Sequence, residues 1–198
     1  MPVRSTRDSK SMTAPRALLE DMTVSLVRGL PLSDEPGLGS LTIPGFLQDV
    51  CGRHPEREAL VIHHADRVER WTYQDLWDHS VEVARALIAS GVGKDSRVGI
   101  LMTNRPEYLS ALFGTAMAGG VAVALSTFST AAELKHLVTV SGISTLLFED
   151  RVLNRDFAAM LVELEPALAA SVPGELASTR FPFLQRLVCL KGITGIAR

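Results

Sequence analysis

The sequence predicts an α/β fold, with a layered, mainly parallel sheet and flanking helices, preceded by a short hairpin. Short β-prone runs alternate with longer segments whose apolar residues recur at every third or fourth position. Several helical segments open at residues that cap helices well and end at glycine. Alternation at these lengths indicates right-handed βαβ crossovers, which build a parallel sheet with helices on its faces.

Residues 1–42 are expected to form an N-terminal arm that is partly disordered. Its start is rich in Arg, Ser and Thr, and residues 31–45 are rich in Pro, Gly and Ser, which predicts irregular backbone. No apolar stretch that could serve as a signal-peptide core follows the basic residues, so secretion is disfavoured. An organelle transit peptide shares the Arg and Ser bias, but we favour a disordered tail and a cytoplasmic protein.

A hairpin is the first regular structure expected after the arm. The β-prone runs 59–63 and 68–71 are separated by four residues, a length typical of a hairpin connection. His63 and His64 are adjacent on the first run and should point to opposite faces, one inward and one into solvent. They therefore do not predict a metal site.

The first helix is predicted to begin at Thr72 and to stop at Gly91. The Thr72 hydroxyl can accept a hydrogen bond from a free backbone N–H, and Asp75 places a carboxylate at the positive helix end. Apolar residues between these limits recur at helical spacing and predict one buried face.

The same order of elements then recurs twice. Residues 97–102 predict a strand, followed by a helix that Asn104 caps, with Pro106 in its first turn and Gly119-Gly120 at its end. Residues 121–125 predict a fully buried parallel strand. Thr130 and Glu133 then form a capping box, and the strand 145–148 follows.

The last elements are a helix over 156–165 that Pro166 closes and a strand over 187–190, joined by a long loop. Residues 108–128 carry no charge and approach the length of a membrane span. We reject a transmembrane segment because the glycine pair at 119–120 divides this run into a helical part and a β-branched part.

Composition excludes several classes of function. Twenty Lys and Arg are matched by twenty-two Asp and Glu, for a net charge of −2, so no basic face for nucleic acid is predicted. Cys51 and Cys189 are far apart and belong to no C-x-x-C pair, which predicts reduced thiols and neither a disulfide nor a zinc site. Residues 91–96 resemble a P-loop only superficially, because they follow a helix and precede a strand.

Substrate-binding residues are predicted where strands end. In an open parallel sheet, ligands bind beyond the C-terminal ends of the strands. Asn104, Ser126 and Thr127 follow two of the predicted strands and are the candidates for this role. A purely structural interpretation competes, since Asn104 can cap a helix and the serine and threonine can shape a turn. No catalytic residue is predicted, because no nucleophile–base arrangement or paired carboxylates stand out.

The chain resembles the AMP-forming acyl-CoA synthetases over about residues 43–192. The resemblance rests on the order of individually unspecific motifs, namely Trp71-Thr-Tyr-Gln-Asp-Leu76, Gly91-Val-Gly-Lys-Asp-Ser-Arg-Val98, Asn104-Arg-Pro-Glu-Tyr108, the run 118–128 with Ala132-Glu-Leu134, and residues 181–188. It implies a two-step reaction in which a carboxylic acid attacks the α-phosphate of ATP to give an acyl-adenylate, and the thiol of CoA then displaces AMP. It also implies Mg²⁺ as the cofactor of the first step.

The catalytic segments of that family are missing from this sequence. Members use a Ser/Thr/Gly-rich phosphate loop, a ribose-binding aspartate and a late lysine, and residues 192–195 are too short and lack the lysine to be that loop. We therefore expect residues 43–192 to be an incomplete N-terminal α/β subdomain and residues 193–198 to be a truncated end. We also expect this fragment to be inactive and to bind no ATP, CoA or Mg²⁺ by itself. An uncovered apolar sheet face would favour self-association.

Three interpretations of function remain open at this point. The first is the N-terminal portion of an acid–CoA ligase for fatty or other aliphatic acids. The second is the start of an amino-acid adenylation domain, and the third is a non-catalytic binding module of flavodoxin-like shape. A Thr/Ser/Gly-rich loop encoded directly after Arg198 would favour the first two over the third.

Overall fold

The computed structural model describes residues 31, 34, 42–172 and 175–190. The chain divides into two compact units, residues 1–38 and 39–198, and the fold below is that of the second unit. The predicted arm over 1–42 and the predicted truncated end over 193–198 fall almost wholly outside the described residues, so both stay predictions.

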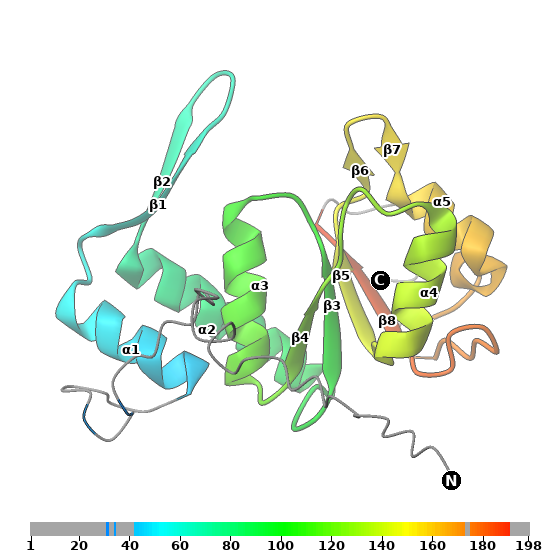
Figure 1. The fold of residues 1–198 in the computed structure, drawn as a ribbon, viewed down its shortest axis with the longest axis horizontal. Coiled ribbons are helices and arrows are strands. Elements are labelled where there is room, and N and C mark those ends of the chain that lie inside the picture. The colour runs from blue at the N-terminus through cyan, green and yellow to red at the C-terminus, as the bar shows by residue number, and fades with distance from the viewer. Residues whose placement is uncertain (1–30, 32–33, 35–41, 173–174, 191–198) are drawn as a thin grey trace, which may run out of the picture. The chain divides into compact units, whose positions relative to one another are not determined.

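The described elements follow the expected alternation of strands and helices (Figure 1). In chain order they are α1 (Ile43–Arg53), β1 (Glu58–His63), β2 (Val68–Thr72), α2 (Tyr73–Ala89), β3 (Arg97–Leu101), α3 (Pro106–Met117), β4 (Val121–Ala124), α4 (Ala131–Ser141), β5 (Thr145–Phe148), β6 (Arg151–Val152), β7 (Arg155–Asp156), α5 (Phe157–Leu164), a 3₁₀ helix (Pro166–Ala169) and β8 (Arg186–Cys189).

The central sheet has four strands in the order β4-β3-β5-β8, and every pair is parallel. Leu101 at the end of β3 is level with Phe148 at the end of β5, and Phe148 is level with Cys189. The predicted parallel α/β sheet is thus confirmed. The predicted hairpin is also confirmed, because β1 and β2 pair antiparallel in a sheet of their own.

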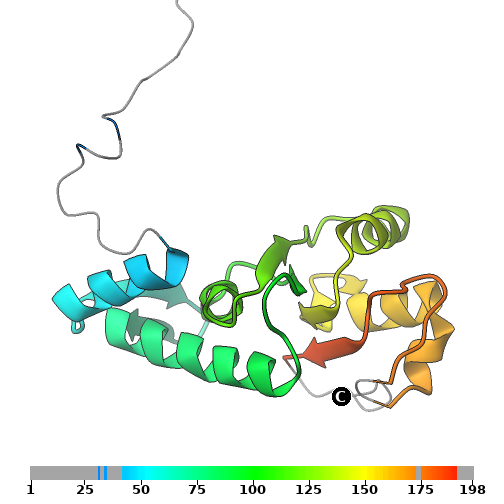
Figure 2. The same ribbon diagram turned by 90° about the horizontal axis from the view of Figure 1, so that it is seen from below.

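Helices cover both faces of the sheet, as Figures 1 and 2 show. Val98 and Ile100 of β3 pack against a cluster that includes residues of α2 and α3. Leu101, Leu146 and Phe148 point to the opposite face, where they pack with residues of α4 and α5. The alternation of side chains along each strand therefore divides the core into two layers.

A third cluster joins α1, the hairpin and the outer side of α3. Leu47 and Cys51 of α1 are buried against Leu76 of α2, with Trp71 and Phe113 packed beside them. The sequence prediction extended the irregular segment to residue 45, but α1 begins at Ile43, with Thr42 as its cap and a proline in its first turn. Proline is tolerated there because the first N–H groups of a helix have no partner within it.

Two of the predicted capping boxes are present. Thr72 accepts from the Asp75 backbone N–H at 3.1 Å and its own N–H donates to the Asp75 carboxylate at 2.8 Å. Thr130 and Glu133 make the same pair of bonds at the start of α4. Gly91 after α2 and Gly142 after α4 have φ angles of 88° and 62°, the left-handed conformation expected of helix stops.

The predicted cap at Asn104 is wrong. Arg105 is the N-cap of α3, with φ −144° and ψ 160°, and no side chain caps this helix. Pro106 is the reason, because the ring of a proline disfavours helical backbone in the residue before it, so the helix starts one residue later than predicted.

Three further predictions need correction. β4 is an edge strand and not fully buried, with Val121 half exposed. His63 and His64 are both exposed, because the tip of the hairpin extends beyond the core, and His64 Nε2 lies 2.9 Å from a Glu69 carboxylate oxygen. The short hairpin β6–β7 was not predicted, since its strands have only two residues each.

Candidate functional site

The C-terminal edge of the sheet gathers the residues that follow β3, β4 and β5. These strands are parallel and nearly in register, so residues 102–105, 125–129 and 149 all leave the sheet at the same edge. Crevices outside the carboxyl ends of strands are where open α/β sheets bind ligands. The predicted residues Asn104, Ser126 and Thr127 all belong to these segments.

Asn104 lies in the loop between β3 and α3. It is exposed and lines a cavity of about 260 Å³ together with Leu60 and Ile62 of the hairpin and Tyr108 and Leu109 of α3. Within the described residues its side chain makes no hydrogen bond. A free amide beside apolar walls can donate to and accept from a small molecule.

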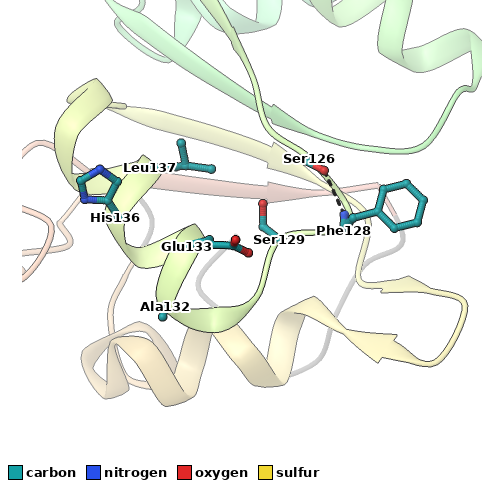
Figure 3. Close-up of a pocket in the computed structure, with 7 residues that line it drawn as sticks. All are labelled: Ser126, Phe128, Ser129, Ala132, Glu133, His136 and Leu137. Carbon is teal, nitrogen blue, oxygen red and sulfur yellow. Dashed lines mark hydrogen bonds between the residues drawn. The ribbon is translucent and has the colours of Figure 1, made fainter.

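Ser126 and Thr127 lie in the loop between β4 and α4. Ser126 lines a different, open groove of about 610 Å³, and its Oγ accepts a hydrogen bond from the Phe128 N–H at 3.1 Å (Figure 3). Thr127 is half-buried, and its side chain has no hydrogen-bond partner in the described part of the chain. The structure therefore brings the three predicted residues to one edge of the sheet but not into one of these cavities.

The groove against α4 is mostly apolar. Phe128 is 76% exposed beside it, and in Figure 3 its ring points away from the other labelled side chains. Glu133 also lines it, but its carboxylate already accepts from the Thr130 N–H at 2.7 Å and hydroxyl at 2.9 Å. The Thr130 hydrogen bonds lower the pKa of Glu133, which makes it a weak base. The groove can hold apolar groups, and His136 is a further polar side chain in its lining.

A polar cluster that the sequence reasoning missed ties this edge together. Glu149, directly after β5, accepts from both the Thr103 N–H and the Thr103 hydroxyl, each at 2.7 Å. Its other oxygen accepts from Arg105 Nη1 at 2.8 Å. Arg105 also donates through Nε and Nη2 to both oxygens of Glu107, at 2.8 and 2.9 Å.

These bonds fix the charge states of the cluster. Burial by itself would raise the pKa of Glu149, but hydrogen bonds from Thr103 and then Arg105 outweigh it and hold that pKa below its usual value. The hydrogen bond from Arg105 lowers the pKa of Glu107, and the same bond raises the pKa of Arg105. The cluster is therefore a charged, internally satisfied network at neutral pH.

A sequence signal for this cluster existed. Glu149 directly follows the buried strand β5, and Thr103 lies two residues after the end of β3 beside it. Side chains just beyond the ends of parallel strands lie at one edge of the sheet, so a carboxylate and a hydroxyl in these positions were candidates for a pair. The sequence reasoning considered only the strands that end before Asn104 and Ser126.

The remaining candidates carry no chemistry. Residues 91–96 lie at the opposite, N-terminal end of β3, where Gly93 N–H donates to Ser96 Oγ at 3.1 Å, so they form a turn and not a phosphate loop. Burial followed by the charge of Asp78 raises the pKa of the Cys51 thiol, which makes it unreactive. No cluster of three or more metal-binding side chains occurs within residues 42–172 and 175–190.

Comparison with known proteins decides the family. A profile of the AMP-binding enzyme family matches residues 47–184. These residues include the polar cluster and every strand of the central sheet except β8. The chain belongs to the AMP-binding enzymes. The resemblance to AMP-forming acyl-CoA synthetases and the predicted fold are thereby confirmed.

Relatives of this chain carry acyl-CoA ligase names. YngI of Bacillus subtilis (strain 168), named as an acyl-CoA synthetase, is 33% identical over 157 residues, which are 78% of this chain and 28% of YngI. Acyl-CoA ligase SID4 of Ajellomyces capsulatus is 30% identical over 70% of this chain and 23% of its own length. The mitochondrial medium-chain acyl-CoA ligase ACSF2 of Homo sapiens is 29% identical over 76% of this chain and 24% of its own length.

Solved structures share the fold. A fatty acyl CoA synthetase of Mycobacterium tuberculosis superposes with a TM-score of 0.57 at 22% identity, over 75% of this chain and 26% of that one. The anthranilate CoA ligase AuaEII, solved with anthranoyl-AMP, gives a TM-score of 0.59 at 18% identity, over 81% of this chain and 27% of that one. This chain thus spans about a quarter of the length of these proteins. None of its described helices is long and apolar enough to cross a membrane.

Proposed function

We propose that this chain is the N-terminal portion of an acid–CoA ligase. In this reaction a carboxylate attacks the α-phosphate of ATP, pyrophosphate leaves, and the CoA thiol then displaces AMP from the acyl-adenylate. The observation that carries the proposal is the family match over residues 47–184, together with relatives that are named acyl-CoA ligases. The parallel sheet with exposed polar residues at its C-terminal edge supports it.

The proposed substrates are ATP, CoA and a fatty or other aliphatic acid, with Mg²⁺ assisting the first step. The names of the medium-chain ligases among the relatives support the aliphatic class. Asn104, Ser126 and Thr127 are the proposed substrate contacts, because they lie at the edge where such sheets bind ligands. This chain's contribution is to bind and orient, since neither a phosphate loop nor a catalytic lysine segment of the family can be recognised in its sequence.

Two further properties belong to the proposal. A cytoplasmic location is supported by the buried thiol of Cys51, which suits a reducing compartment. Self-association is supported by exposed apolar residues on the outer strands, Val121 of β4 and Val188 of β8, which are 50% and 46% exposed.

The test joins the complete 198-residue chain to the part of YngI that follows its matched segment. We expect acid-dependent exchange of pyrophosphate with ATP and acyl-CoA formation from the fusion, and no exchange from the chain alone. YngI itself is the positive control. Exchange stimulated by amino acids and not by aliphatic acids would support an adenylation domain instead.

A fusion that unfolds cooperatively yet activates no acid, beside an active YngI control, would refute the ligase proposal and favour a non-catalytic binding module. Exchange above background by the chain alone would refute the inactivity of this portion. Circular dichroism during heating establishes whether the fusion is folded, so an inactive result can be interpreted.

A further inference from the structure

Three residues tether the loop that carries Asn104. We call Thr103, Arg105 and Glu149 the strand-end clamp. Thr103 and Arg105 flank Asn104 in sequence, and both donate to the same carboxylate, that of Glu149. The Glu149 backbone N–H in turn donates to the Leu101 carbonyl at 3.0 Å, which anchors the carboxylate's own backbone to β3. The loop is therefore held on both sides of one residue.

The clamp has the geometry of a rigid support. The side chains of Arg105 and Glu149 are only 24% and 14% exposed, so solvent screens their ion pair less than a surface pair. Glu107 holds the guanidinium of Arg105 through two parallel bonds, which leaves it one orientation toward Glu149. Thr103, Arg105, Glu107 and Glu149 thus all bond to one another within the cluster, which holds their side chains in place.

Asn104 lies between the two tethered residues, and its own side chain takes no part in the clamp. Its side chain is exposed, lines the cavity against the hairpin, and makes no hydrogen bond within the described residues. It is also not the helix cap, because Arg105 occupies that position. A polar side chain with no structural partner, on a loop fixed at both flanks, is the arrangement that an effective ligand contact needs.

We infer that the strand-end clamp positions Asn104 for contact with the carboxylic acid or adenylate of the proposed ligase. The inference rests on the proposed function. Thr103 and Glu149 are positioning residues, which act through the backbone of Asn104. Arg105 shares this positioning role, and it also lines the cavity beside Asn104. Asn104 donates or accepts one hydrogen bond, whose geometry depends on the clamp.

The structural half of the inference is tested on the complete chain by amide hydrogen exchange. Glu149→Ala should reduce protection of the Thr103 amide about tenfold or more, since that amide loses a bond to a charged acceptor. Asn104→Ala should leave this protection unchanged. Glu163→Ala, at an exposed position of α5, is the matched control. Unchanged protection of Thr103 in Glu149→Ala would overturn the clamp.

The functional half is tested in the YngI fusion by a double-mutant cycle. Asn104→Ala and Glu149→Ala should each lower kcat/KM for pyrophosphate exchange about tenfold or more, because small misplacements of a contact are costly. The kcat/KM of the double variant should be no lower than that of the less active single variant, because Glu149 acts through Asn104. Glu149→Gln, which can still accept from Thr103, should restore part of the activity.

The outcomes separate the two proposals. Additive losses, or an Asn104→Ala fusion as active as its parent, would overturn the positioning role while leaving the ligase intact. A folded but inactive parent fusion would overturn the ligase function and, with it, the role of Asn104. Amide hydrogen exchange across the whole chain, measured for each variant, shows whether that variant is simply less stable. Loss of fold can then be distinguished from loss of positioning.

Discussion

Replacing Gly114 by alanine should force α2 and α3 apart. A Cβ atom there would lie 2.7 Å from Val83 Cγ1, 2.8 Å from Val83 Cβ and 2.9 Å from the Ser80 carbonyl oxygen. Favourable carbon–carbon contacts lie at about 3.5–4.0 Å. The Val83 Cβ and the Ser80 carbonyl cannot rotate away, because they are fixed to the backbone of α2. The helices must therefore separate or bend.

The magnitude follows from two opposing effects. Overpacking of a rigid site costs up to about 3 kcal/mol. Alanine is better than glycine in a helix interior by about 1 kcal/mol. Gly114→Ala should therefore lower the free energy of unfolding by about 2 kcal/mol, which corresponds to a fall in Tm of roughly 4–8 °C for a chain of this size.

The assay is urea unfolding followed by circular dichroism, with the midpoint interpreted only where the slope is unchanged. Gly52→Ala in α1 is the matched control, because no atom lies within 4 Å of its added Cβ, and it should be stabilising by up to about 1 kcal/mol. A Gly114→Ala chain as stable as the parent would refute the close crossing of α2 and α3.

Three further predictions concern the cap, the clamp and the sheet edge. Thr72→Ala should lower the free energy of unfolding by about 1 kcal/mol in the same urea assay, because it removes the hydroxyl that caps α2, and no loss would contradict the cap. The stabilisation from Glu149, whose folded-state pKa is lowered, is present above the unfolded pKa and disappears as the pH falls through the lower, folded value. Glu149→Gln should therefore be destabilising at neutral pH and flatten the loss of stability below about pH 4.5, and an unchanged acid limb would exclude this assignment. Val188→Lys should reduce concentration-dependent sedimentation and binding of hydrophobic dyes if the β8 edge self-associates, whereas a parent chain that is already monodisperse and binds no dye would argue against self-association.

Local chemistry made much of the fold predictable. The capping boxes at Thr72 and Thr130 need only a hydroxyl and a carboxylate three residues apart, so the sequence shows both partners. The start of α3 was misplaced by one residue, because Asn104 is a good cap but Pro106 shifts the cap to Arg105. In that case two local signals competed, and the steric one prevailed.

The candidate site was only half predictable. Asn104, Ser126 and Thr127 were found because each follows a strand, but whether they share a cavity depends on where the hairpin and α4 pack. Glu149 was missed because it lies 46 residues from Thr103 along the chain, although the two residues are hydrogen-bonded in space. Their positions after two strands mark both as candidates, but only the strand order shows that the two strands are neighbours.

The sequence by itself determined the alternation of the main strands and helices, the caps at Thr72 and Thr130 and the family, because these depend on residues within a few positions of one another or on the order of motifs along the chain. Only the tertiary structure decided that β4 is an exposed edge, that α2 and α3 touch at Gly114, and that Glu149 closes a clamp around Asn104. The physical reason is that burial and ion pairing depend on neighbours in space, and the order of strands in the sheet, β4-β3-β5-β8, sets those neighbours.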